Sequence, residues 1–127
     1  MKDNNICNIV FVGESGVGKT SIINTLLKEK FTHNHITTIG IGNNLTQVKV
    51  NNQILDVNFI DTAGQEKYRS VTKLFYAKKD IIILVYDVTN LDSYNAIKTH
   101  WVKEVKDNAK NLKGKKNNIY YIFYIYF

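Results

Sequence analysis

The sequence predicts an α/β protein, with a central and mainly parallel sheet between layers of helices. Three observations support this fold class. Short apolar segments that are typical of buried strands alternate with segments whose apolar residues recur at helical spacing. The continuous apolar run IIILVYD at 81–87 is typical of a parallel strand that is covered on both faces. Two further strand-like segments are separated by only two residues, which is the length of a tight hairpin turn.

The first predicted elements are a strand, a glycine-rich turn and a helix. The segment ICNIVFV at 6–12 is short, rich in β-branched residues and followed by Gly13, which favours a buried strand. The segment KTSIINTLLKEK at 19–30 places its isoleucines and leucines on one helical face. Residues 31–44 are mostly polar and contain two glycines, so we expect a loop.

A hairpin, a second glycine-containing break and the strand at 81–87 follow. Residues 45–50 and 53–60 are predicted to form antiparallel strands about a turn of two asparagines. The segment DTAGQEKYRS at 61–70 breaks the strand pattern, and residues 67–79 are compatible with a helix.

The last third of the chain is expected to hold one more helix and a polar loop. Asp92 and Ser93 are candidate caps for this helix. Apolar side chains then follow at helical spacing, namely Tyr94, Ile97, Trp101 and Val105. We expect Trp101 to serve in helix packing, and residues 110–118 to form a loop. The chain contains no internal repeat and no linker, so residues 1–127 are predicted to form a single domain.

The final segment IYYIFYIYF at 119–127 has three interpretations. It is a fifth strand beside 81–87, or a segment that contacts a membrane surface next to a lysine-rich stretch. In the third interpretation it is a sequence that was never selected as a strand, such as read-through from an intron. Four tyrosines in nine residues suit a buried parallel strand poorly, because each hydroxyl needs a partner.

Composition argues against several other classes of protein. The formal charge is +6, but the chain has 16 lysines and only one arginine, Arg69. Arginine is the usual residue for bidentate recognition of bases and phosphates, so we expect a solvated basic surface and no nucleic-acid partner. No run reaches the roughly 20 apolar residues that are needed to span a bilayer, and the first residues resemble a strand more than a signal peptide.

The single cysteine and the three histidines suggest no reactive or metal centre. Cys7 has no partner for a disulfide within the chain, which favours a reducing, cytoplasmic compartment. Its apolar surroundings favour a core position over a nucleophile. His33, His35 and His100 have no spacing that is typical of a metal cage.

The segment GESGVGKT at 13–20 matches the phosphate-binding pattern G-x-x-x-x-G-K-[ST] in full, between a predicted strand and a predicted helix. Glycines allow positive φ and remove Cβ, so that backbone N–H groups can converge on an anion at the helix start. Lys19 is placed to reach the β- and γ-phosphates, and Thr20 to offer its hydroxyl to Mg²⁺. A glycine turn that merely starts a helix is the alternative, but a chance match is about one in a few hundred for a chain of this length.

The segment NFIDTAGQE supplies a second set of candidate residues. Asp61 ends a predicted strand and suits an outer-shell role on Mg²⁺, Gly64 permits an N–H to face a γ-phosphate, and Gln65 is placed to orient an attacking water. Alone this segment is compatible with an ordinary turn. At this distance after a phosphate-binding loop it is specific.

Together these motifs resemble a small GTPase of the Ras superfamily, and within it the Rab family. The supporting segments are GESGVGKT, TTIG at 37–40, DTAGQEKYRSVT at 61–72 and VYDVTN at 85–90, together with Trp101. The resemblance covers roughly residues 6–110 and implies the three-layer α/β/α fold of P-loop NTPases, with one antiparallel edge pair. The segment 87–105 leans toward the endosomal Rab branch.

The resemblance implies GTP or GDP and Mg²⁺ as cofactors. Thr20 and Thr38 would ligate the metal, with Asp61 behind a water, and Phe31 would lie against the guanine. Gln65 would position the hydrolytic water, and loops at about 31–43 and 62–76 would order around the γ-phosphate. The implied nucleotide-binding residues are Gly13, Glu14, Ser15, Gly16, Val17, Gly18, Lys19, Thr20, Ser21, Phe31, Thr38 and Gly64.

The resemblance also implies a role and partners. It implies a monomeric switch in vesicle-mediated transport, on the cytosolic face of vesicle or endosomal membranes. No arginine is placed to act in cis, so slow turnover and dependence on a GTPase-activating protein are expected, beside an exchange factor and effectors.

The sequence departs from the Rab pattern in its last part and in one loop. The motifs N-K-x-D and S-A-K do not occur, and the last strand, the last helices and the prenylated tail have no counterpart, so we expect no lipid anchor in this chain. Rab proteins usually have Asp-Phe where this chain has Gly42 and Asn43, which puts effector recognition in doubt. The alternative function is therefore a non-catalytic or non-functional truncated fragment that keeps the switch surface but does not select guanine over adenine.

Overall fold

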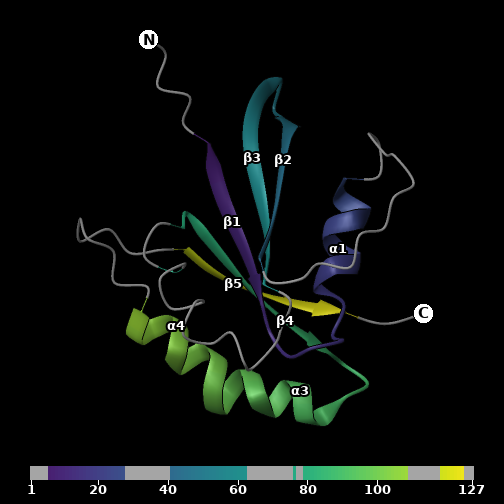
Figure 1. The fold of residues 1–127 in the computed structure, drawn as a ribbon, viewed down its shortest axis with the longest axis vertical. Coiled ribbons are helices and arrows are strands. Elements are labelled where there is room, and N and C mark those ends of the chain that lie inside the picture. Colours follow the sequence, from purple (N-terminus) through teal and green to yellow (C-terminus); the bar gives the residue numbers. More distant parts are fainter. Residues whose placement is uncertain (1–5, 28–40, 63–75, 77–78, 109–117, 125–127) are drawn as a thin grey trace.

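The computed structural model describes residues 6–27, 41–62, 76, 79–108 and 118–124. Within these ranges the strands form a single sheet in the order β2-β3-β1-β4-β5, and every pairing is parallel except that of β2 with β3 (Figure 1). The predicted fold class, a mainly parallel sheet with one antiparallel edge pair, is confirmed. In chain order the elements are β1 Cys7–Val12, α1 Lys19–Leu26, β2 Ile41–Val50, β3 Gln53–Thr62, β4 Ile81–Asp87, α3 Leu91–Ala96, the π-helical segment η3 Ile97–Trp101, α4 Val102–Asn108 and β5 Asn118–Tyr124.

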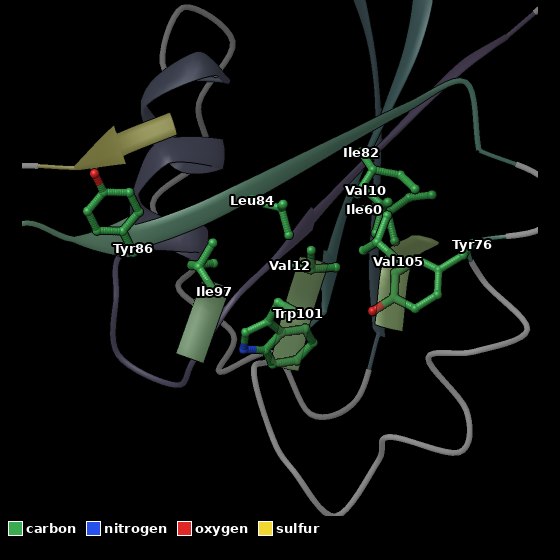
Figure 2. Packing of buried hydrophobic residues seen from close by; sticks show 10 residues of the cluster. All are labelled: Val10, Val12, Ile60, Tyr76, Ile82, Leu84, Tyr86, Ile97, Trp101 and Val105. Atoms are coloured by element: carbon green, nitrogen blue, oxygen red, sulfur yellow. The ribbon is translucent and has the colours of Figure 1, made fainter. Parts of the chain in front are cut away.

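Two apolar clusters show that the described helices cover opposite faces of the sheet. In β1, Val10 and Val12 belong to the cluster under α3, η3 and α4, whereas Phe11 belongs to the cluster under α1. This alternation is the period of two that a strand imposes on its side chains. Figure 2 shows the first cluster, in which Trp101 and Val105 lie against side chains from β1, β3 and β4. The three-layer arrangement and the packing role of Trp101 are therefore confirmed.

The hairpin of β2 and β3 is longer than the sequence predicts. Residues 41–44 were expected in a loop, but they are paired in β2 with the last residues of β3. Glycine and asparagine are poor strand formers, so the local pattern was misleading. Hydrogen bonds of side-chain amides compensate for this low strand propensity. Asn58 Nδ2 donates to Asn43 Oδ1 at 3.1 Å, and Asn44 Nδ2 donates to the Phe59 carbonyl at 3.2 Å.

The start of the helix after β4 also differs from the prediction. Asn90 is the N-cap, and its side chain accepts hydrogen bonds from the backbone N–H groups of Asp92 and Ser93. Asp92 and Ser93 were predicted as caps, but both lie in the first turn. The Ser93 hydroxyl instead binds the end of β4, where it accepts from the Asp87 N–H at 3.0 Å.

The strand interpretation of the C-terminal segment is confirmed for residues 118–124. β5 pairs in parallel register with β4, from Ile81↔Asn118 to Asp87↔Tyr124. The first predicted helix is confirmed as α1. Its predicted end at 28–30, most of the loop at 31–44 and nearly all of the possible helix at 67–79 lie outside the described residues.

Two further observations bear on the predictions from composition. Cys7 is half-buried at the margin of the α1 cluster, and the pKa of its thiol is raised by burial and by the carboxylate of Asp80. A thiol with a raised pKa is a poor nucleophile, in agreement with a packing role. None of the described helices is both long enough and apolar enough to cross a bilayer.

Candidate functional site

The candidate site lies at the carboxyl ends of the parallel strands β1 and β3. The loop of residues 13–18 leaves β1 and leads directly into α1. Asp61 near the end of β3 is in register with Phe11 of β1, so the two predicted motifs are brought together. This edge of a parallel sheet is where α/β proteins bind their ligands.

The loop between β1 and α1 has the backbone of an anion-binding turn. Gly16 has φ 76° and Gly18 has φ 105°, which are positive values that L-residues rarely adopt. Gly18 is also the N-cap of α1, and no side chain caps the helix. The residues Lys19–Leu26 place no acidic group in the first turn, so its N–H groups and the positive end of the helix dipole remain available to an anion.

Space for a ligand exists beside Gly16. A Cβ built on this residue would meet no heavy atom of the described residues within 4 Å. Ser15 and Gly16 are exposed, whereas Val17 is buried in the α1 cluster. Val17 therefore anchors the loop through its side chain, and the tip of the loop remains open to a phosphate group.

Lys19 is folded back over this loop. Its side chain is buried, and Nζ donates to the carbonyl oxygens of Gly13 at 3.0 Å and Glu14 at 2.6 Å. An ammonium group has three hydrogens, and the two bonds to these carbonyls of the described residues leave one donor for a ligand. Burial lowers the pKa of Lys19 to about 8, against the opposing effects of the Asp61 and Glu14 carboxylates. An arriving anion would replace the lost hydration of this cation and stabilise its charged form.

This lowered pKa predicts proton uptake on nucleotide binding. A bound phosphate raises the pKa of Lys19 from about 8, so binding takes up protons increasingly as the pH rises from 7 to 8.5. The affinity should fall over the same range, because the free protein loses the charge that the complex needs. Calorimetric titration with GDP in two buffers of different ionisation heat measures the uptake. A proton uptake that is the same at pH 7 and pH 8.5 would contradict the prediction that Lys19 binds the phosphate.

Thr20 and Asp61 form the second half of the site. The Thr20 hydroxyl donates a hydrogen bond to Asp61 Oδ2. Asp61 is 2% exposed, and its other oxygen, Oδ1, has no hydrogen-bond partner among the described residues. A buried carboxylate oxygen without a partner is costly, which indicates that a further group belongs beside it.

This pair of side chains fits Mg²⁺. Hydroxyl and carboxylate oxygens are ligands that Mg²⁺ accepts, and the ion is commonly held by one or two protein groups together with phosphate oxygens and water. No cluster of three or more histidine, cysteine, aspartate or glutamate side chains is found in the described part of the chain. The donor set of Thr20 and Asp61 therefore suits a metal that is shared with a nucleotide better than an all-protein metal centre.

Most of the predicted site residues are brought together, and others cannot be placed. Residues 13–21 and Asp61 surround one edge of the sheet. The remaining predicted residues are Phe31, Thr38, Gly64 and Gln65, and all four lie outside the described ranges.

One contact at the site was missed by sequence reasoning. Trp101 Nε1 donates to Glu14 Oε1 at 2.8 Å, across 87 positions of sequence. The helical spacing of Trp101 indicated packing and gave no signal for this polar contact.

The fold and the loop agree with a comparison against known families. The model of the Ras family matches residues 8–122. The chain belongs to the Ras family. This Ras-family chain resembles the Ras-related protein Rab-11B of Dictyostelium discoideum, with 34% identity over 90% of the chain and 54% of the relative. It is also similar to the Ras-related protein SEC4 of Saccharomyces cerevisiae, with 38% identity over 90% of the chain and 55% of the relative.

A third relative extends the same pattern. The GTP-binding protein yptV2 of Volvox carteri is 35% identical over 87% of the chain and 50% of that protein. The Ras-family chain therefore spans about half the length of the curated relatives that it matches. The resemblance to the Rab family is confirmed by these relatives, whereas the lean toward the endosomal branch stays a prediction.

Proposed function

We propose that this Ras-family chain is a guanine-nucleotide-binding switch of the Rab type, with slow Mg²⁺-dependent hydrolysis of GTP. The single observation that supports this most is that the Lys19 ammonium, which binds the glycine loop, lies near the buried carboxylate of Asp61 beside Thr20, and that Asp61 Oδ1 has no hydrogen-bond partner among the described residues. A cation and a carboxylate side by side suit a ligand that brings both negative charge and a divalent ion.

In this function the described residues divide the work between phosphate and metal. The backbone of residues 13–18 and the third donor of Lys19 bind the phosphate oxygens. Thr20 would ligate Mg²⁺ and Asp61 would hold it through a water, and the ion would neutralise phosphate charge when it is bound. Placement of the attacking water is assigned to Gln65 by the resemblance alone.

Regulation and location belong to the same proposal. Turnover is slow and depends on a GTPase-activating protein, because the only arginine, Arg69, has no assigned place at the phosphates. An arginine supplied in trans contributes about 10³ to 10⁵ in rate in this class of reaction. An exchange factor and effectors act on a monomer at the cytosolic face of vesicle or endosomal membranes.

A second candidate function is a phosphate-binding domain without guanine selectivity. The groups that the described residues bring to the site, namely Lys19, Thr20 and Asp61, suit phosphate and metal, and none of them distinguishes guanine from adenine. A charged hydrogen bond to the base is worth about 1.5–3 kcal/mol, so a site without one would leave ATP and GTP competing on similar terms.

A titration separates the two candidates. The purified chain is titrated with fluorescently labelled GTP and ATP in the presence of Mg²⁺. Micromolar or tighter binding with preference for GTP supports the switch. Equal binding of both nucleotides supports the second candidate, and binding of neither contradicts both.

The proposed metal role predicts the effect of Asp61→Asn. The asparagine keeps the shape of the side chain but removes the charge beside Thr20, so Mg²⁺ should slow nucleotide release much less than in the wild type. Loss of a group that orients a metal site typically costs about 10- to 100-fold in metal affinity or activity. The measurement is the nucleotide dissociation rate at increasing Mg²⁺ concentration.

A matched control lies on the same strand. Asp56 pairs with Gln47 at the outer part of the hairpin, where Gln47 Nε2 donates to Asp56 Oδ1 at 3.0 Å. Asp56→Asn removes the same charge from β3 and should leave the Mg²⁺ dependence unchanged. Identical Mg²⁺ dependence in both variants would show that Asp61 does not serve the metal.

A further inference from the structure

The hydrogen bond between Trp101 and Glu14 connects the helical layer to the phosphate loop. Trp101 is 2% exposed and belongs to the apolar cluster under α3, η3 and α4 (Figure 2). Its indole N–H nevertheless leaves this cluster to reach a carboxylate oxygen of the loop, at 2.8 Å. A buried indole N–H needs a partner, and here the partner is a charged one in the functional site.

Glu14 is held at two points that belong to opposite layers. Its main-chain oxygen accepts from Lys19 Nζ at 2.6 Å, and Lys19 is the first residue of α1. Its side-chain oxygen accepts from Trp101, the last residue of η3. Since α1 and η3 pack on different faces of the sheet, these two bonds fix both the position of the first loop residues and the direction of the Glu14 side chain.

The direction of this side chain matters because of its charge. Glu14 is the only acidic residue in the loop of residues 13–20. A carboxylate that turned toward the open space beside Gly16 would repel a phosphate, since like charges a few ångströms apart repel each other strongly at the effective dielectric of a protein surface. The bond to Trp101 directs the carboxylate toward the α3–α4 layer instead.

The backbone of the helical layer is irregular where Trp101 is placed. Residues Ile97–Trp101 form a π-helical turn between α3 and α4. Such a turn accommodates one residue more than an α-helical turn, so the side chains at its end point in a different direction from those of a regular helix. π-Helical turns are frequent at functional sites. Ile97 and Val105 remain buried in the same cluster, so the irregular turn keeps the packing while the indole reaches Glu14.

We propose that Trp101 is a positioning residue for phosphate binding, which acts by holding the Glu14 carboxylate away from the anion. The proposal rests on the proposed nucleotide-binding function, but it needs only a phosphate ligand and not guanine selectivity. Trp101 does not itself touch the ligand. It keeps the only negative charge of the loop aimed at the helical layer.

The test is a pair of substitutions and their combination. Trp101→Phe keeps an aromatic ring in the core and removes the donor, so the dissociation of labelled GTP, or of labelled ATP, should become about 10-fold faster. Glu14→Gln keeps an acceptor for the indole and removes the charge, so it supplies the uncharged background in which the loss of the donor is compared. The double variant should regain most of the lost affinity, because no carboxylate is left to repel the phosphate.

A purely structural role of Trp101 gives different results. Val105→Ala opens a cavity in the same cluster without touching Glu14, and serves as the control for general loosening of the core. If Trp101→Phe releases nucleotide no faster than Val105→Ala, or if Glu14→Gln fails to restore binding in the Trp101→Phe background, the proposal is overturned. Where Trp101→Phe does not fold, β-(3-benzothienyl)alanine at position 101 keeps the ring size and removes the donor.

The contact can also be followed without any nucleotide. Trp101 is the only tryptophan of the chain, so fluorescence that is excited at a wavelength where tyrosine does not absorb reports this indole alone. We expect the emission of the free protein to shift in Glu14→Ala, which removes the acceptor, and to change little in Glu14→Gln. An unchanged emission in Glu14→Ala would contradict the hydrogen bond itself.

These outcomes keep the two proposals apart. A wild-type chain that binds ATP and GTP equally would contradict guanine selectivity. The role of Trp101 would then be tested by the dissociation rate of labelled ATP from the same variants. A wild-type chain that binds GTP, with variants that all release it at the same rate, would contradict the role of Trp101 alone. A wild-type chain that binds neither nucleotide would overturn both.

Discussion

Lys19→Ala should abolish nucleotide binding and leave the fold intact. The ammonium group of Lys19 reaches the loop of residues 13–18 through its bonds to the carbonyl oxygens of Gly13 and Glu14. Each hydrogen bond to a charged group is worth about 1.5–3 kcal/mol, so the loss of one ammonium that serves several phosphate oxygens weakens binding by at least about 100-fold. Fluorescence polarisation with labelled GTP and Mg²⁺ measures this loss.

The stability of the free protein should change little in the same variant. Burial disfavours the charged form of Lys19, as its lowered pKa of about 8 indicates, so removal of the side chain relieves a desolvation cost while it removes two hydrogen bonds. Lys49→Ala is the matched control, because it removes the same charge from an exposed position on β2. Equal nucleotide binding by Lys19→Ala and Lys49→Ala would mean that the loop is not the phosphate site.

The parts of the site that sequence could predict are those whose signal is local. The phosphate loop is contiguous, and its glycines, Lys19 and Thr20 must stand in a fixed order because one turn of backbone forms the whole cradle. β4 could be predicted as a strand because a run of apolar residues suits only a segment that is buried on both faces. Asp61 could be predicted because it lies near the carboxyl end of a strand that is paired with the strand before the loop.

The parts that sequence could not predict depend on distant partners. The first four residues of β2 include Gly42, Asn43 and Asn44, which are poor strand formers, but Asn58 and the backbone of β3 bind the side chains of Asn43 and Asn44. The contact of Trp101 with Glu14 spans 87 positions and depends on a π-helical turn that helical spacing does not reveal. In both cases tertiary hydrogen bonds overrule or extend the local pattern.

Gly13→Ala should be the most destabilising single substitution in the loop. Gly13 has φ 152°, and a Cβ built on it would lie 2.2 Å from the Val85 carbonyl oxygen and 3.2 Å from the Val85 carbonyl carbon. The obstacle is the backbone of Val85 in β4. Because the Val85 side chain is fully buried in the packed core, neither Gly13 nor Val85 can shift without a large cost in packing. We expect a loss of about 4 kcal/mol or more, which is a large share of the 5–15 kcal/mol that stabilises a typical domain.

Gly16→Ala separates this steric effect from the chemistry of the cradle. Gly16 has φ 76°, so alanine there costs about 1–2 kcal/mol of backbone strain, but no heavy atom of the described residues lies within 4 Å of the added Cβ. Denaturant unfolding followed by circular dichroism should therefore show a folded Gly16→Ala beside a mostly unfolded Gly13→Ala. Gly16→Ala should still bind labelled GTP more weakly than the wild type, because its methyl group occupies the space that a phosphate needs. If Gly13→Ala proved as stable as Gly16→Ala, the loop would not be pressed against β4, and the geometry that places Lys19 and Glu14 would be wrong.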